Sequence, residues 1–159
     1  MTDEQRRTRI VSRHERLIAS SPARIGELVR DFDRIWPTEI APAPQAVSDC
    51  LFDAGPMLWQ EIDRPGASRA FVVAGPGGLR AEHWFELQQV DGGTLVSHTV
   101  EGETLGESEA VWAERIEPLH DLLLEALLDN VEANVASDEP RAGGRSVDRP
   151  GMRGGSSVS

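Results

Sequence analysis

The stretch HWFELQQVDGGTLVSHTV contains the two residues best suited to chemistry in this sequence, His83 and His98. Apolar and polar residues alternate on both sides of Asp91–Gly92, and this pattern predicts a β-hairpin closed by a two-residue turn. In a strand, every second side chain points to the same side. The spacing of the two histidines from the turn therefore places both on the apolar side of the hairpin.

The register of this hairpin decides which residues accompany the histidines. Pairing of Val90 with Gly93 puts a set of pocket candidates on one side, which we expect to be concave: His83, Phe85, Leu87, Val96, His98 and Val100. A three-residue loop over residues 91–93 would shift the pairing by one residue and break this match. The two-residue turn is the register that we expect.

Two imidazoles in an apolar cavity would be mostly neutral at physiological pH, because desolvation lowers their pKa values. A neutral imidazole offers one hydrogen-bond donor and one acceptor. It can therefore orient a carbonyl or hydroxyl group of a ligand, or move a proton during an aldol-type ring closure and dehydration. The alternative is that each histidine bonds a neighbouring side chain or a water molecule and only packs.

Other side chains would complete such a pocket or give it a different chemistry. The further pocket candidates are aromatic or aliphatic residues together with a third histidine: Trp36, Trp59, Phe71, Leu119, His120 and Leu123. The three histidines would suffice as zinc ligands, but their spacing matches no metal-binding motif, so we expect no metal and no cofactor. No motif such as GxSxG assigns a catalytic residue.

A long C-terminal helix is the clearest element that could position these groups. Residues from about Ser108 to Val135 place apolar side chains at helical spacing along one stripe: Trp112, Ile116, Leu119, Leu123, Ala126 and Leu127. Pro118 lacks a backbone N–H and should kink the helix about one turn from its start. His120 stands at the border of the stripe. Such a helix needs a broad apolar surface to lie on.

The rest of the chain predicts that surface. Residues 9–18 can form a strand, and Ser20 or Ser21 can cap a short helix that has Pro22 in its first turn. Short β-like runs separated by Gly and Pro then predict successive hairpins: residues 46–52, 57–63, 69–75, 79–90 and 94–105. The order indicates an α+β fold, with helices on one face of a curved antiparallel sheet.

Three phrases carry a family resemblance: ASSPARIGELVRDFDRIWP, GPGGLRAEHWFELQQVDGGTLVSHTVEGE and ERIEPLHDLLLEALLDNVE. Together they resemble the START-like (SRPBCC) superfamily of polyketide cyclase/dehydrase and lipid-transport proteins, over about Arg9 to Val135. The resemblance implies a helix-grip fold, in which the curved sheet wraps around the C-terminal helix and leaves a cavity between them. It supplies no shared catalytic motif, so no catalytic residue is assigned.

The resemblance implies two classes of function. The first is binding of a small hydrophobic, lipid- or polyketide-like molecule, by a carrier or by a cyclase/dehydratase. The second is a non-enzymatic protein-interaction module, similar to a co-chaperone or a toxin–antitoxin component. An open cavity with inward-facing histidines would favour the first class, whereas a filled groove would favour the second.

Composition restricts the possible partners and compartment. The formal net charge is −11, which argues against nucleic-acid binding. Cys50 is the only cysteine, so no intramolecular disulfide can form, and no apolar run approaches bilayer length. We therefore expect a cytoplasmic monomer or homodimer that does not insert into membranes. The expected organisation is a flexible N-terminus (1–8), the domain (9–136) and a disordered tail rich in Gly, Ser and Arg (137–159).

Overall fold

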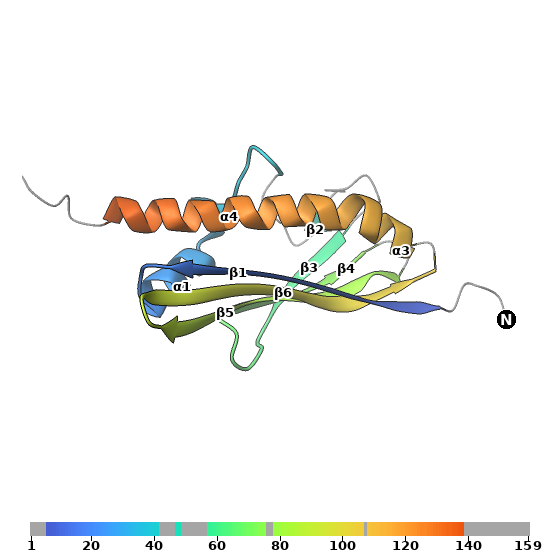
Figure 1. Ribbon diagram of the computed structural model, residues 1–159. Helices are drawn as coiled ribbons and strands as arrows, with labels where there is room; N and C mark the ends of the chain where they lie inside the picture. The colour runs from blue at the N-terminus through green and yellow to red at the C-terminus, as the bar shows by residue number, and fades with distance from the viewer. Residues whose placement is uncertain (1–5, 42–46, 49–56, 76–77, 107, 139–159) are drawn as a thin grey trace, which may run out of the picture.

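A curved antiparallel sheet beneath a long helix forms the frame of the computed structural model, which describes residues 6–41, 47–48, 57–75, 78–106 and 108–138 (Figure 1). The strands are β1 (Arg7–Ile18), β2 (Val47–Ser48), β3 (Met57–Ile62), β4 (Arg69–Ala74), β5 (Arg80–Val90) and β6 (Gly93–Leu105). They follow the order β1-β6-β5-β4-β3-β2, and each neighbouring pair is antiparallel. The α+β prediction is confirmed. Cys50 and the tail beyond Asp138 lie outside the described residues.

The central hairpin β5–β6 has the register expected from its turn. Val90 pairs with Gly93, and Phe85 pairs with His98. Gly92 has a φ of +87°, a left-handed conformation that glycine adopts without steric cost. The two-residue turn at Asp91–Gly92 therefore fixes which side chains of both strands face the helix.

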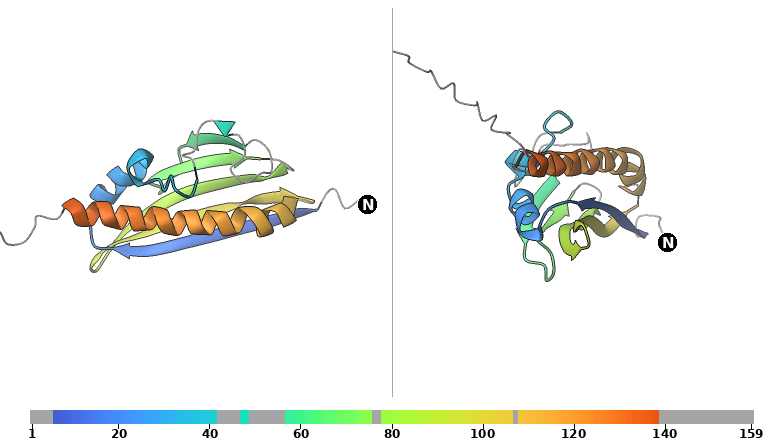
Figure 2. Two further views of the ribbon diagram at one scale, coloured as in Figure 1. Left: turned by 90° about the horizontal axis from the view of Figure 1, so that it is seen from above. Right: turned by 60° about the vertical axis from the view of Figure 1, so that its left-hand side comes forward.

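A short helical excursion follows β1 and closes one end of the fold. Helix α1 (Pro22–Arg30) begins at Ser21, whose Oγ accepts a hydrogen bond from the backbone N–H of Arg24. Helix α2 (Phe32–Ile35) follows directly. Leu28 of α1 is fully buried against the sheet and the C-terminal helix. Figure 2 shows α1 beside the C-terminal end of the long helix, above the curving sheet.

The long helix is interrupted near the proline that predicted a kink. It consists of α3 (Ser108–Val111), a π-helical segment η3 (Trp112–Ile116) and α4 (Glu117–Asp138). In the π-helical turn, the N–H of Glu117 bonds to the carbonyl oxygen of Trp112. Because Pro118 cannot donate a hydrogen bond and its ring crowds the preceding turn, the widened turn just before it accommodates the proline. In Figure 1, α3 bends away from the axis of α4 at this point.

Helix α4 buries a wider face than the sequence stripe suggested. Its buried residues include several outside the predicted set: Leu124, Leu128, Val131 and Val135. Leu119 and Ala126, by contrast, are only half-buried. The face is wider because α4 packs both on the sheet and on α1 and α2, so two surfaces cover it. None of the helices in the described residues is long and apolar enough to cross a membrane.

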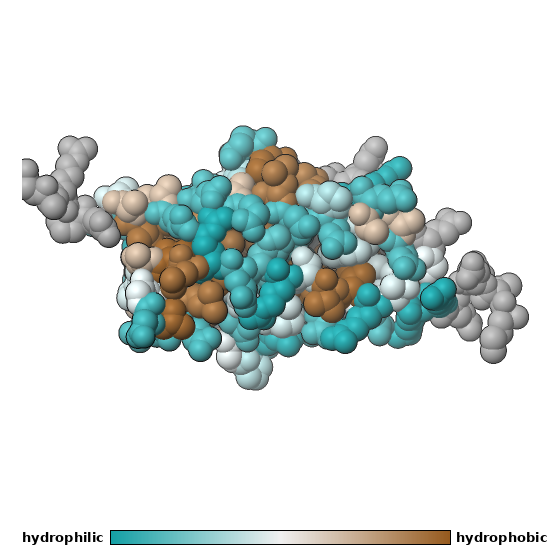
Figure 3. Space-filling view, in the orientation of Figure 1, coloured by the Kyte–Doolittle hydropathy of each residue, from teal (hydrophilic) through white to brown (hydrophobic). Residues whose placement is uncertain are grey.

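Acidic residues of α4 form ion pairs with a strand of the sheet. These pairs lie along β1, at the edge of the sheet, where Arg16 contacts three carboxylates, those of Glu125, Asp129 and Glu132. His14, two residues earlier on β1, bonds to Asp121 and Glu125. In Figure 3 this face of the molecule is largely hydrophilic, with separate apolar patches. We name these contacts the β1–α4 seam.

The packing of α4 makes a stability prediction with an internal control. Leu128 is fully buried, whereas Leu122 on the same helix is 57% exposed. Leu128→Ala should lower the free energy of unfolding by about 2–5 kcal/mol, the usual range for truncating a core leucine. Leu122→Ala should change it by less than about 0.5 kcal/mol. Urea unfolding followed by circular dichroism measures both, and similar losses in the two variants would mean that this face of α4 is not core.

Candidate functional site

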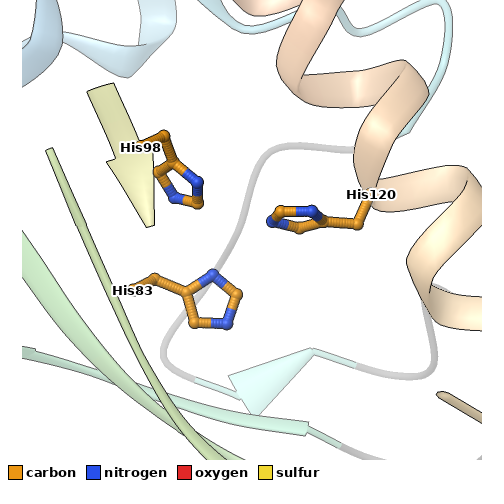
Figure 4. Close-up of side chains that lie close together, drawn as sticks. All are labelled: His83, His98 and His120. Atoms are coloured by element: carbon orange, nitrogen blue, oxygen red, sulfur yellow. The ribbon is translucent and has the colours of Figure 1, made fainter. Parts of the chain in front are cut away.

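Three of the four histidines of the chain converge in the space between the sheet and α4. His83 comes from β5, His98 from β6 and His120 from α4, and their rings point toward one another (Figure 4). The ring centroids lie 5.7 Å apart for His83–His98, 5.5 Å for His83–His120 and 5.3 Å for His98–His120. We name these residues the histidine cluster.

The elements place the cluster between two separate apolar cores. One core surrounds α1 and the C-terminal part of α4, and the other surrounds η3 and the opposite end of the sheet. Along β5, His83 stands between Ala81 of the second core and Phe85 of the first; along β6, His98 stands between Val96 and Val100 in the same way. Along the helix, His120 likewise stands between residues of the second core and residues of the first. The cluster thus lies between the two cores on each of the three elements, β5, β6 and the long helix.

Burial determines the charge of the cluster. His83, His98 and His120 are only 8%, 4% and 8% exposed. Desolvation, followed by repulsion from neighbouring histidines, lowers the pKa of His83 and His98 well below the usual value. Desolvation and the nearby His14 likewise lower the pKa of His120 to about 4. All three imidazoles are therefore neutral at physiological pH.

Three of the six ring nitrogens of the cluster are buried and lack partners among the described residues. Nδ1 of His98 and both ring nitrogens of His120 are buried without a hydrogen bond, and so is Nε1 of the adjacent Trp59. A buried polar atom without a partner costs about 1–3 kcal/mol, and folded proteins contain few of them. The alternative in which the histidines bond to neighbouring side chains thus does not hold for these atoms within the described residues.

Two adjoining cavities of about 40 Å³ each open beside the cluster. Both are lined by Trp36, Trp59, His83, His120 and Leu123, and one also reaches Phe71, Phe85 and His98. The remaining sequence candidates line neither cavity: Leu87, Val96, Val100 and Leu119. Lining residues that were not proposed as candidates include Val73, Leu79, Ala81, Trp112 and Ile116. The helical stripe predicted that Trp112 and Ile116 face inward, but not that they adjoin the histidines.

A larger hollow, of about 400 Å³, lies away from the cluster on the outer face of the sheet. Trp84 and Glu82 line it together with Arg64, whose guanidinium stacks 3.7 Å from the centroid of the Trp84 ring and pairs with Glu82. Its volume is open to solvent, and all three of its carboxylates, those of Glu82, Glu101 and Glu103, already pair with arginines. The smaller inner cavities, where polar atoms lack partners, form the better candidate site.

His14 carries charge at the rim of the cluster, in a role that sequence reasoning did not assign. Its Nδ1 lies 2.9 Å from Oε1 of Glu125 and its Nε2 lies 2.8 Å from Oδ1 of Asp121. Carboxylates only accept hydrogen bonds, so both ring nitrogens must donate and His14 is an imidazolium. Desolvation opposes this charge, but the two hydrogen bonds outweigh it and raise the pKa of His14. Asp121 also lies 3.8 Å from Nδ1 of His120.

Replacement of histidines on the two sides of Asp121 should have opposite effects on stability. In ligand-free protein, His120→Leu removes two buried nitrogens without partners and should raise the free energy of unfolding by about 1–3 kcal/mol. His14→Leu removes two hydrogen bonds to half-exposed carboxylates and should lower it by about 1–2 kcal/mol. Thermal unfolding of both variants checks this. Destabilisation by His120→Leu would mean that His120 holds the fold together.

The stability of ligand-free protein should also fall as the pH is lowered from about 6.5, the ordinary pKa of histidine, toward 4. The three cluster histidines are neutral when folded but take up protons when unfolded, so the unfolded state binds more protons in this range. His14 acts in the opposite sense, since its contribution is present at low pH and is lost as the pH rises through its raised pKa. The midpoint of denaturant unfolding, measured across this pH range, should fall less steeply with decreasing pH in His120→Leu than in the wild-type protein. An equally steep fall in both proteins would contradict the assignment of His120 as a neutral, buried imidazole in the folded state.

Comparisons with known proteins place the fold. No protein-family model and no curated protein matches the sequence. Among solved structures, the Zhui aromatase/cyclase from Streptomyces sp. R1128 aligns with a TM-score of 0.55 and 17% identity, over 80% of this chain and 96% of that chain. Ara h 8.0201 aligns with a TM-score of 0.53 and 16% identity, over 82% of this chain and 100% of that one.

A third similar structure is protein MLL2253 from Mesorhizobium loti, with a TM-score of 0.53 and 14% identity, over 82% of this chain and 100% of that chain. At these identities the likeness concerns the fold alone. The element order, the single antiparallel sheet and the helix laid along it agree with that likeness. The chain has the helix-grip fold of START-like proteins.

Proposed function

We propose that the protein binds a small, mainly apolar molecule between the sheet and α4, and that Trp59 and the histidine cluster hydrogen-bond a polar group on it. The observation that carries this proposal is a set of buried ring nitrogens that have no partner in the described part of the chain. They belong to Trp59, His98 and His120, which line one apolar space. A ligand oxygen supplies the acceptor that Nε1–H of Trp59 lacks. The neutral imidazoles can then donate to or accept from the same group.

The size of the cavities sets a requirement for this binding. Each holds about 40 Å³, whereas sites for drug-sized ligands usually measure about 300–1,000 Å³. A ligand must therefore displace a side chain of the wall. Trp36 is held in place, since its Nε1 donates to the carbonyl oxygen of Ala41 at 2.8 Å. Trp59 is half-buried and its Nε1 makes no hydrogen bond to any residue that the structure describes, so we assign Trp59 as the wall that moves.

The fold supports the class of ligand. One structure of this fold is that of an aromatase/cyclase, and this chain has the same arrangement of sheet and helix. A lipid- or polyketide-like molecule, carried or cyclised, fits an apolar pocket with a few polar groups. Binding is the step common to a carrier and a cyclase/dehydratase. The exposed large apolar residues Val11, Leu17, Leu58 and Leu122 are divided among β1, β3 and α4, which does not favour a protein-interaction surface.

A matched pair of probes tests the polar contact. 2-Acetylnaphthalene and 2-ethylnaphthalene have nearly the same shape, but only the first carries a carbonyl oxygen. We expect the ketone to bind more tightly by about 1–3 kcal/mol, because it satisfies a buried donor that the hydrocarbon leaves unpaired. Trp59→Phe should abolish this preference while keeping an aromatic wall. Trp84→Phe, the same change on the outer face, should leave it intact.

Isothermal titration calorimetry measures both affinities, and native mass spectrometry of freshly purified protein shows whether an apolar molecule travels with it. Equal affinity for the two probes in the wild-type protein would refute the polar contact. Failure of both probes to bind, together with the absence of any copurifying molecule, would refute the ligand-binding function.

A further inference from the structure

We propose that His83, His98 and His120 form a binding site for a divalent transition-metal ion, with Zn²⁺ as the expected occupant. This site goes beyond the binding of an apolar molecule, and its existence can be tested without one. When the ion is bound, the ligating ring nitrogens of His98 and His120 hold the metal, so a ligand's polar group then meets the ion instead of those nitrogens. Sequence spacing gave no indication of a metal site, because the three ligands come from two strands of a hairpin and from a helix more than twenty residues further on. The fold alone brings them together.

The geometry is close to that of a three-histidine metal site. Each residue offers one ring nitrogen, and these three nitrogens all lie within 4.8 Å of one another. A tetrahedral zinc ion with Zn–N bonds of about 2.0–2.1 Å holds its nitrogens about 3.4 Å apart. The nitrogens therefore have to approach one another by at most about 1.4 Å, a change that rotations of the side chains can supply. Figure 4 shows the helix-borne His120 directed at the space between the other two rings.

The chemistry of the ligands selects the class of metal. Neutral imidazole is a good ligand for zinc, copper and nickel, whereas magnesium and calcium require oxygen ligands. All three rings are buried, so few water molecules compete with the imidazole nitrogens for a bound ion. The site also gives partners to nitrogens of His98 and His120 that otherwise have none.

A second group, His14, His120 and Asp121, also brings potential ligand atoms within the same distance of one another. Two of its members are already engaged, because His14 donates to Asp121 and also to Glu125. A cation there would have to displace an imidazolium from its carboxylates. Asp121 has a different role in our proposal. It lies 3.8 Å from Nδ1 of His120, where a carboxylate can orient a metal-bound histidine.

Three protein ligands leave the fourth position of a tetrahedral ion open. That position faces the apolar cavities, which are lined by Trp59 and Leu123. Sites with three protein ligands and one open position are typical of zinc that binds a water molecule or a substrate oxygen. The oxygen of a bound molecule can therefore coordinate the metal directly.

The test uses untagged, full-length protein stripped of metal with a chelator, because a histidine tag would itself bind zinc. Calorimetry with Zn²⁺ should show one ion per chain, and Mg²⁺ should not bind. His83→Leu, His98→Leu and His120→Leu should each weaken binding by more than about 100-fold, since even partners of metal ligands change affinity by about 10–100-fold. His14→Leu should weaken it by less than about 10-fold, because His14 is not a ligand. Circular dichroism establishes that each variant is folded.

A measurement on the wild-type protein makes the test independent of the variants. Co²⁺ in a four-coordinate nitrogen site gives intense visible absorption, whereas six-coordinate Co²⁺ gives weak absorption, so the Co²⁺ form should be intensely coloured. Absence of Zn²⁺ binding, binding that survives the three cluster substitutions, or its loss in His14→Leu would overturn the proposal. Loss of the ketone preference with intact Zn²⁺ binding would refute the proposed function and leave the metal site standing.

Discussion

The packing of α4 along the concave face of the sheet is the contact on which the rest of the structure depends. Leu127, Leu128 and Val131 of α4 are buried together with residues of α1, β5 and β6 in one apolar core. This core fixes the height of the helix above the sheet at the C-terminal half of α4. Just before α4 begins, Trp112 and Ile116 of η3 belong to a second core. The long helix therefore packs on one core near each of its ends and crosses the region between them.

The histidine cluster occupies the region between these two cores. An aliphatic residue at any of the three positions would join the two cores into one, at lower cost in desolvation. The chain instead places an imidazole at the same level on β5, β6 and α4, and nitrogens of two of them have no partner among the residues that the structure places. Buried polar groups that weaken a core occur mainly at functional sites, and other parts of the protein compensate for the lost stability. Here the two flanking cores, with their fully buried leucines and valines, provide that stability.

Part of this arrangement could be read from the sequence. Asp91–Gly92 determines the hairpin register, which in turn places His83 and His98 on the same side, and both steps depend on residues close in the chain. His120 was also a pocket candidate, but its distance from the other two histidines could not be derived in the same way, because the π-helical turn before Pro118 shifts the phase of the helix relative to a regular α-helical stripe. The role of His14 was also missed, because alternating polar residues on a strand do not reveal which acidic residues lie opposite. The size of the cavities depends on how Trp36 and Trp59 pack, and no local pattern reports that.

The β1–α4 seam has a consequence for how the protein is made. It joins the first strand of the described chain to its last helix, and the contact between Arg16 and Asp129 spans 113 positions of sequence. The pairing of β1 with β6 likewise joins residues far apart, such as Arg7 with Leu105. Such nonlocal contacts slow folding, because a long loop must close before they form. During synthesis on a ribosome, β1 therefore has no strand to pair with until β6 emerges. The contacts between β1 and α4 form only after α4 has also been synthesised.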